Sequence, residues 1–341
     1  MDEELQVLLE AAEARALNEF RTRYMSGVYS ELMQTRTDAR GFIKLFATAE
    51  GSVFERFKGA FSASSIEERG LTIIADRFGL SKNIPMQKWD QLIAWLGNSF
   101  PGLMADAGMK GAFKIDLLAN DLLARAVAGT IAAPTNLPNL YDDAVALGNV
   151  EAPGSGAHGP VIRNTNRIDG GTYTEANLRA AYYTVLEALA EFKSPDGSPY
   201  FNPMELVGGL RIMQPVLGKV QRILDLVFAT GRTVGDTTRP RIVGVEMRPN
   251  SLWNQDSRLK AKGLFFYLPT VSNLTWFQFV QTITGMTFAD DLPDNEAGLR
   301  KQSAEQQKTQ RYTLTATKDM EVGIGSPIQG IWVDFTGMEG K

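Results

Sequence analysis

Side chains that perform acid–base or nucleophilic chemistry are scarce in this sequence. The 341 residues contain one histidine, His158, and no cysteine. Thiolate metal sites, cysteine nucleophiles and multi-histidine zinc sites are therefore excluded. A Ser-His-Asp triad would have to use His158, which lies among glycines, and no Gly-x-Ser-x-Gly motif accompanies it. We interpret His158 as a loop histidine and predict no catalytic residue.

Two further motifs have the letters of a ligand site without its context. Residues 154–159 match Gly-x-Gly-x-x-Gly, but Pro153 precedes the match and Pro160 follows it, where a dinucleotide site needs a strand and a helix. The three aspartates within 290–294 have no calcium-loop spacing. We predict no cofactor and no metal. A pair of distant carboxylates for acid–base work stays open, because any fold can bring such groups together.

Composition indicates a well-packed protein rather than a dedicated nucleic-acid binder. Hydrophobic residues make up 44% and charged residues 22%, and the formal net charge is −4, so we expect a substantial core and no basic face. The first residues are acidic where a secretory signal needs positive charge, and no apolar run approaches the ~18 residues of a membrane span. We expect a soluble protein, made in the cytoplasm, without a membrane.

Two N-terminal segments show patterns that need a partner. Residues 1–25 predict an amphipathic helix with one apolar stripe, which packs either on its own domain or on a neighbouring subunit. Residues 40–90 predict extended chain, with an exposed hairpin over 66–77 that is weak by itself. Phe54, Phe57 and Phe61 in this segment face either an interface or their own domain. The stripe consists of Leu5, Leu9, Ala12, Ala16, Phe20 and Tyr24.

The remaining pattern predicts an α+β fold. We expect helical chain over 88–131, broken near 100–102 and 108–111, a loop over 133–172, and a helix over 173–192 with a capping box from Thr172 and Glu175. A strand at 210–213 should lead into a helix that Pro215 opens and that runs to 229. Further strands are expected at 241–247, 263–268, 311–317 and 328–335.

The order of these elements resembles a known family. A Gly/Pro-rich loop is followed by a helix, by the turn Phe-Lys-Ser-Pro-Asp-Gly-Ser-Pro at 192–199, and by the strand Leu-Arg-Ile-Met-Gln-Pro at 210–215 that leads into a helix. An aromatic strand follows at 263–268. This order is similar to that of the major head subunit of Mu-like phages and, behind it, the tailed-phage capsid fold of Hong Kong 97 type. The resemblance covers roughly 25–335 and lies in pattern more than in signature residues.

The resemblance implies parts, partners and a place. Residues 1–40 would be an N-terminal arm, 41–90 an extended hairpin loop over a neighbour, 91–139 and 300–341 a peripheral domain with a long spine helix, and 140–299 an axial domain. The chain would self-assemble as hexamers and pentamers into an icosahedral shell around double-stranded DNA, without sequence specificity. Scaffold, portal and possible decoration proteins would be partners. The protein would be in the host cytoplasm during assembly and in the virion capsid afterwards.

These expectations single out residues for contacts between subunits rather than for catalysis. They lie on the leading helix and on the hairpin, the two segments whose patterns want a partner. The predicted contact residues are Leu9, Phe20, Tyr24, Phe54, Phe57, Leu71, Ile73, Ile74 and Arg77.

Three other functions stay open at this point. An encapsulin-like compartment shell would keep the fold and enclose an enzyme instead of DNA. Another virion structural protein, such as a tail component, would form tubes rather than closed shells. A carboxylate-based hydrolytic enzyme would show a concave pocket with convergent polar groups and shifted pKa values.

Overall fold

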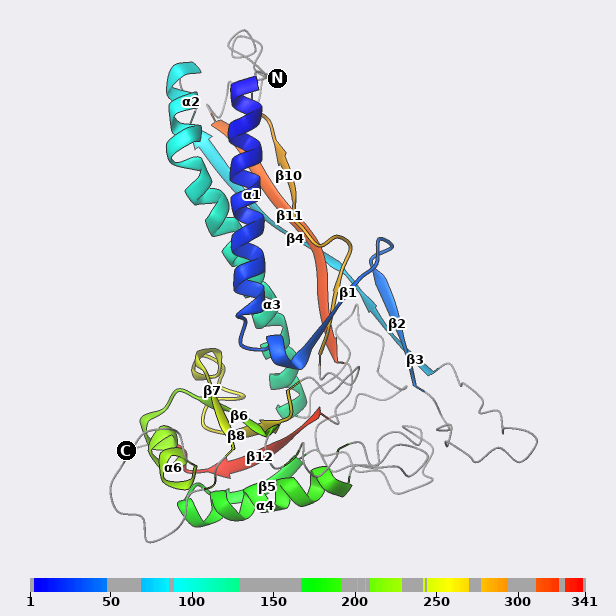
Figure 1. The fold of residues 1–341 in the computed structure, drawn as a ribbon, viewed down its shortest axis with the longest axis vertical. Helices are drawn as coiled ribbons and strands as arrows, with labels where there is room; N and C mark the ends of the chain where they lie inside the picture. Colours follow the sequence, from blue (N-terminus) through cyan, green and yellow to red (C-terminus); the bar gives the residue numbers. More distant parts are fainter. Residues whose placement is uncertain are drawn as a thin grey trace, which may run out of the picture.

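The chain forms an elongated body with two α/β parts, one above the other (Figure 1). The computed structural model describes residues 3–47, 69–85, 89–128, 167–191, 209–228, 244–269, 277–292, 311–324 and 329–339, and the single positions 201, 206 and 242. The upper part holds the first three helices beside a long sheet, and the lower part holds a second sheet with two helices. The mixed α+β class predicted from the sequence is confirmed.

Helix α1 (Glu3–Met25) lies along the upper part and packs on α3. Glu3 and Glu4 in its first turn and Arg23 in its last turn suit the helix dipole. Its inner stripe is buried in the chain, as its spacing of three and four residues predicts. The buried residues are Leu5, Leu9, Ala12, Ala16 and Phe20.

Helices α2 (Trp89–Asn98) and α3 (Phe100–Ala128) follow each other, with a break at Ser99. Pro101 stands in the first turn of α3, where its missing N–H costs no hydrogen bond. The second predicted break, at 108–111, is wrong, because α3 continues through it. A Cβ on Gly108 would lie 2.0 Å from the carbonyl oxygen of Ala16. Gly108 therefore serves the close approach of α1 to α3 instead of ending a helix.

The upper sheet is built around one long strand, β11 (Arg311–Ile324). Along one edge it pairs with β4 (Asp76–Pro85), and along the other with β10 (Thr287–Asp290) and then β9 (Phe277–Gln281). Strand β1 (Met33–Thr37) adds to β9 in parallel. The sequence analysis missed β1, β9 and β10. Strands β1 and β10 carry few apolar residues, so hydrogen bonding to their neighbours, rather than an alternating pattern, makes them strands.

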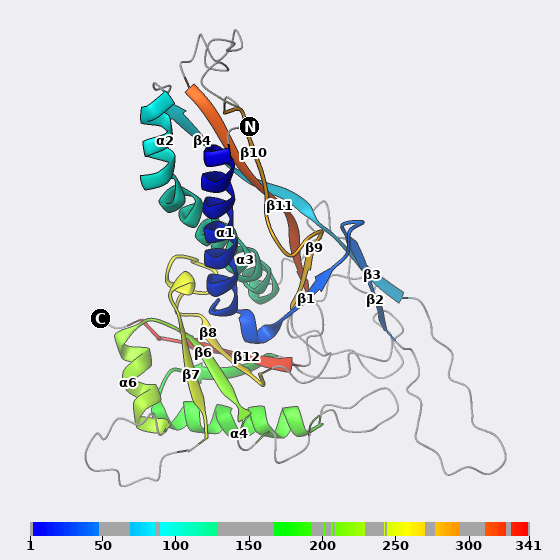
Figure 2. The same ribbon diagram turned by 45° about the horizontal axis from the view of Figure 1, so that its top comes forward.

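Strands β2 (Phe42–Ala47) and β3 (Arg69–Ile74) form a separate antiparallel pair, with Phe42 opposite Ile74. We call this pair the ribbon. Within the described residues, the two strands pair with each other and with no third strand. The ribbon projects sideways from the upper sheet, away from the helices (Figure 2). The exposed hairpin predicted over 66–77 is wrong, because β3 is a single strand that pairs with β2, and β4 joins the upper sheet. Residues 48–68 lie outside the described residues.

The lower sheet has the order β5–β12–β8–β6–β7. Helix α4 (Glu175–Glu191) and helix α6 (Gly218–Val227) pack beside it, and two short 3-10 turns, η1 (Ser30–Leu32) and η3 (Ser251–Asn254), lie between the parts. Both central strands, β8 and β12, are almost wholly buried. The strands are β5 (Arg167–Thr172), β6 (Arg211–Pro215), β7 (Glu246–Asn250), β8 (Gly263–Tyr267) and β12 (Gly330–Thr336).

Three local predictions in the lower part are wrong. The end of the predicted loop is strand β5, which pairs with β12 in parallel. The capping box from Thr172 and Glu175 is replaced by Thr174, whose hydroxyl accepts the N–H of Asn177. Pro215 ends strand β6 instead of opening a helix, and α6 begins at Gly218.

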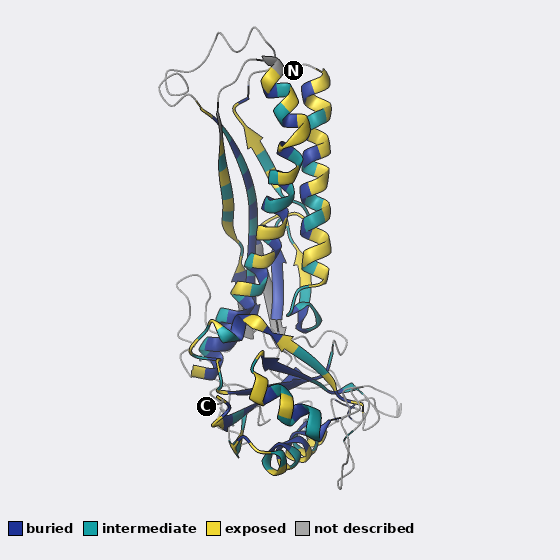
Figure 3. Cartoon of the chain, turned by 90° about the vertical axis from the view of Figure 1, so that its left-hand side faces the viewer, coloured by how far each residue is buried: buried dark blue, intermediate teal, exposed yellow. Residues whose placement is uncertain are grey.

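The sheets divide the chain differently from the boundaries predicted for the peripheral and axial domains. Strands β9 and β10, predicted within the axial segment 140–299, belong to the upper sheet. Strand β12, predicted within the peripheral segment 300–341, lies in the lower sheet between β5 and β8. Strand pairing over long sequence separations therefore decides which sheet each strand belongs to. Buried residues line strands β8, β9 and β12, whereas exposed residues follow the outer faces of the long helices (Figure 3).

Candidate inter-subunit site

The apolar stripe of the leading helix is used inside the chain. Leu9 and Phe20 are buried among residues of α2, α3 and the upper sheet. The prediction that these two side chains contact a neighbour is therefore wrong, and packing on their own domain, the alternative left open, is what the structure has. The physical reason is that α3 and β11 already remove the stripe from water.

On the hairpin, the predicted contact residues divide between inside and outside. Ile73 is fully buried against Gly323 of β11, so its predicted contact with a neighbour is also corrected. Ile74, the next residue, points the other way and is 46% exposed. Arg77 is exposed and donates to the carboxylate of Asp319, at 2.7 Å from Nε to Oδ1. Ile74 and Arg77 remain candidates for a neighbour.

The other predicted residues are less informative. Tyr24 stacks on Phe20 and contacts the Phe279 ring, so it is partly used by its own domain. Phe54 and Phe57 lie outside the described residues, and of Leu71 only the backbone in β3 is described.

A cluster of charges that sequence reasoning missed joins the two parts of the body. Glu31, in the turn after α1, forms ion pairs with Arg211 of β6 and Arg248 of β7. Tyr267 of β8 donates its hydroxyl hydrogen to the same carboxylate at 3.0 Å. Burial raises the pKa of the Tyr267 hydroxyl, and the Glu31 charge raises it further. We call this cluster the Glu31 joint, since it links the end of α1 to the lower sheet.

Beneath the joint, three buried polar groups form a chain. Trp253 Nε1 donates to the Tyr29 hydroxyl at 2.9 Å, and that hydroxyl donates to Asn120 Oδ1 at 2.8 Å. Tyr29 and Trp253 are fully buried, and burial raises the pKa of Tyr29 far above its ordinary value. These hydrogen bonds tie η1, η3 and α3 together at the meeting point of the two sheets. No local signal marks it, because its partners are 91 and 224 residues apart.

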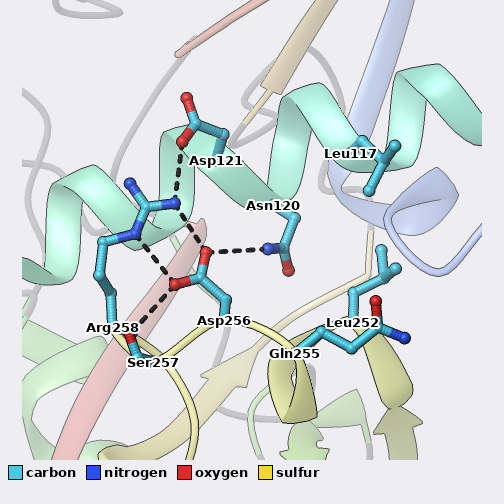
Figure 4. Close-up of a pocket in the computed structure, with 8 residues that line it drawn as sticks. All are labelled: Leu117, Asn120, Asp121, Leu252, Gln255, Asp256, Ser257 and Arg258. Atoms are coloured by element: carbon cyan, nitrogen blue, oxygen red, sulfur yellow. Dashed lines mark hydrogen bonds and ion pairs between the residues drawn. The ribbon is translucent and has the colours of Figure 1, made fainter.

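A hollow of about 420 Å³ lies between α3 and the loop after η3 (Figure 4). In it, Arg258 donates to both oxygens of Asp256 and to Asp121, while Asn120 reaches Asp256 from the helix. Hydrogen bonds from Arg258 lower the pKa of the Asp256 carboxyl. The Asp256 carboxylate is thus held ionised beside an arginine. This arrangement fastens a loop to a helix.

Within the described ranges, the side chains assemble no group of three or more His, Asp or Glu that would hold a metal ion. In the same part of the chain, no helix combines the length and apolarity that crossing a bilayer requires.

Lys318 is a buried cation in the upper sheet, only 2% exposed. Its Nζ donates to the carbonyl oxygens of Ile283 and Gly285, at 2.9 and 2.7 Å, and lies 4.8 Å from the centre of the Phe20 ring. Desolvation by burial lowers its pKa to about 8, against a smaller opposing effect of Asp319. Lys318 therefore holds the β9–β10 turn against α1 at an electrostatic cost.

This cost predicts a pH-dependent stability. Because the pKa of Lys318 is lower in the folded chain than in the unfolded chain, the unfolded chain binds more protons between pH 8 and pH 10.5. The free energy of unfolding should therefore rise across that window by up to ~3 kcal/mol more than it does in Lys318→Met, which lacks the titrating amine. Urea titrations of both proteins at several pH values measure the difference. An equal slope in the two proteins would contradict the expectation.

No protein-family model matches the chain, and no curated protein matches its sequence. Several solved structures are similar. One is the mature capsid of bacteriophage PhiM1, with a TM-score of 0.48, 14% identity, and coverage of 89% of this chain and 85% of that chain. Another is the capsid of the Cyanophage P-SCSP1u, with a TM-score of 0.49, 10% identity, and coverage of 91% of this chain and 88% of that chain. A third is the procapsid of bacteriophage JBD30, with a TM-score of 0.45, 11% identity, and coverage of 97% of this chain and 75% of that chain.

Proposed function

We propose that this chain is the major capsid protein of a tailed bacteriophage and that its function is to assemble into the icosahedral head shell. The observation that carries the proposal is the ribbon. Strands β2 and β3 project from a body into whose core they send Ile73, and a two-stranded pair is marginal in water. Exposed Ile74 at its base adds apolar surface. Such a pair is stabilised when a neighbouring copy covers it.

The parts implied by the sequence resemblance support this proposal. The structure has a leading helix, a projecting ribbon, a long helix lying on a sheet, and a second sheet with helices. The resemblance is to the Mu-like head subunit, so we infer a head of that type. The elongated body suits tiling around capsomer centres.

We infer that the chain does structural rather than catalytic work. The carboxylates at the Figure 4 hollow and at the Glu31 joint each form ion pairs with arginine, and these ion pairs hold elements of the fold together. The small negative net charge suits a wall beside packaged DNA that is held without sequence specificity, because it avoids tight binding to phosphates. Scaffold, portal and possible decoration proteins would then be partners, with assembly in the host cytoplasm.

The test is assembly of the full chain. Expressed alone and together with the scaffold protein encoded beside it, the chain should form hexamers, pentamers and closed shells visible by negative-stain electron microscopy. Tubes would favour another virion component. A monomer that forms no particle under either condition, measured by light scattering over a wide concentration range, would contradict the proposal. Shells that enclose a cargo enzyme in the producing cell would favour the compartment alternative.

A further inference from the structure

Helix α1 has a second face that the chain leaves uncovered. Val7 is 63% exposed and Met25 is 78% exposed, and Ala11 and Ala14 between them are exposed too. This outer face lies opposite the buried stripe and looks away from α3 (Figure 3). We propose that it binds the α1 helix of a second copy of this chain, with the two helices antiparallel.

The spacing along the helix suits a straight contact. Val7 and Met25 are eighteen residues apart, which is five full turns, so both lie on one face roughly 27 Å apart. The residues between them on that face are short, namely Ala11, Ala14 and Asn18. Short side chains let two helix backbones approach closely, while the large residues at the two ends supply apolar area.

The charges decide the direction. From Glu3 to Ala14 the helix carries Glu3, Glu4, Glu10 and Glu13 and no basic residue. From Arg15 onward it carries three arginines and one glutamate. Two antiparallel copies place the acidic half of each on the basic half of the other, whereas parallel copies place like charges together. The dipoles of two antiparallel helices also attract each other, so they favour the same direction.

One alignment of the two helices satisfies both the spacing of the large apolar residues and the distribution of charge. When Val7 lies opposite Met25 of the second copy, Ala14 lies opposite the second copy's Asn18. Glu10 and Arg21 lie on the same flank of the outer face, eleven residues apart, and both are exposed. In this register Glu10 of each copy meets Arg21 of the other. The twofold axis passes between Ala14 and Asn18, so each contact occurs twice.

This contact goes beyond the proposed function, because it concerns a pair of chains and does not need a shell. A single helix pair buries less than the ~1,000 Å² of a stable interface. We therefore expect a weak dimer in solution, which covalent trapping detects.

Cysteine trapping tests the register, and the chain has no cysteine to interfere. The Val7→Cys, Met25→Cys double variant should form a disulfide-linked dimer, because each sulfur is held beside its partner. The two thiols of one chain are five turns apart and cannot bridge each other. Val7→Cys alone and Met25→Cys alone should stay at the level of Tyr183→Cys, an exposed control on α4. A one-to-one mixture of the two single variants should give heterodimer.

The readout is a non-reducing gel of the full chain, with circular dichroism to confirm folding. Dimer from Val7→Cys alone that matches the double variant would overturn the antiparallel register. A double variant that cross-links no more than the Tyr183→Cys control would overturn the contact itself. Either result, obtained with closed shells in the microscope, would leave the proposed function standing. Cross-linking without shells would support the contact and contradict the function.

Charge exchange in the double-cysteine background gives a second, independent measurement. Glu10→Lys alone and Arg21→Glu alone each place like charges across the twofold, so each should lose most of the covalent dimer. Mixed together, the two variants have opposite charges at both contacts, and the heterodimer should return to the parent yield. Failure of the mixture to recover, with both single variants reduced, would overturn the Glu10–Arg21 register.

Discussion

Replacing Gly108 with alanine is expected to push α1 off α3 and to lower the stability of the chain sharply. The added Cβ would lie 2.0 Å from the Ala16 carbonyl oxygen, which belongs to backbone and cannot rotate away. Both helices must shift, and the buried stripe of α1 loses part of its packing. Forced overpacking of this kind costs about 3 kcal/mol. Urea unfolding followed by circular dichroism and tryptophan fluorescence measures the loss.

Gly102→Ala is the matched control, because it makes the same chemical change in the same helix. A Cβ at Gly102 meets nothing within 4 Å. Alanine is favoured over glycine in a helix by ~1 kcal/mol, so this variant should be slightly more stable than the parent. If the two variants unfold at the same urea concentration, the close approach of α1 to α3 is not what Gly108 provides.

Tyr29→Phe is expected to have the second large effect. The change removes one hydroxyl that both accepts from Trp253 Nε1 and donates to Asn120. Two buried polar groups lose their partner, and each unsatisfied group costs ~1–3 kcal/mol. The loss falls where the upper and lower parts meet, so we expect lower stability and looser coupling between the two sheets. Chemical denaturation and amide hydrogen exchange of the lower strands measure these effects.

Tyr24→Phe provides the comparison for this second change. Its hydroxyl bonds to Thr35 at an exposed position, where water replaces the lost partner. The same atom removed there should change stability by less than ~0.5 kcal/mol. Equal losses in the two variants would show that the buried chain through Tyr29 contributes nothing special.

Local pattern was sufficient for much of the secondary structure. The three-and-four spacing from Leu5 to Phe20 predicted α1, and the apolar spacing in 175–191 predicted α4. Alternation in 311–317 and the apolar run at 263–268 predicted β11 and β8. These elements carry their own signal because burial of one face, or of both, sets the period of the residues that build it.

Prediction from local pattern failed where the structure of a residue depends on a contact far along the chain. Gly108 looked like a helix break and is a point of contact with Ala16. Strands β1 and β10 lack an apolar alternation and are strands because β9 and β11 supply their hydrogen bonds. Tyr29 and Glu31 carry no local mark, yet they connect the two parts of the body through partners far along the chain.

The amino-acid sequence by itself determined that the leading helix has an apolar stripe, that extended chain follows it, and that catalytic and metal chemistry has few residues to use. Only the tertiary structure decided what covers the stripe. It places Leu9 and Phe20 against the chain's own helices and sheet, and it leaves Val7 and Met25 on the outside. The reason is that periodicity reports which side chains avoid water, whereas the identity of the surface that shields them depends on how distant segments pack.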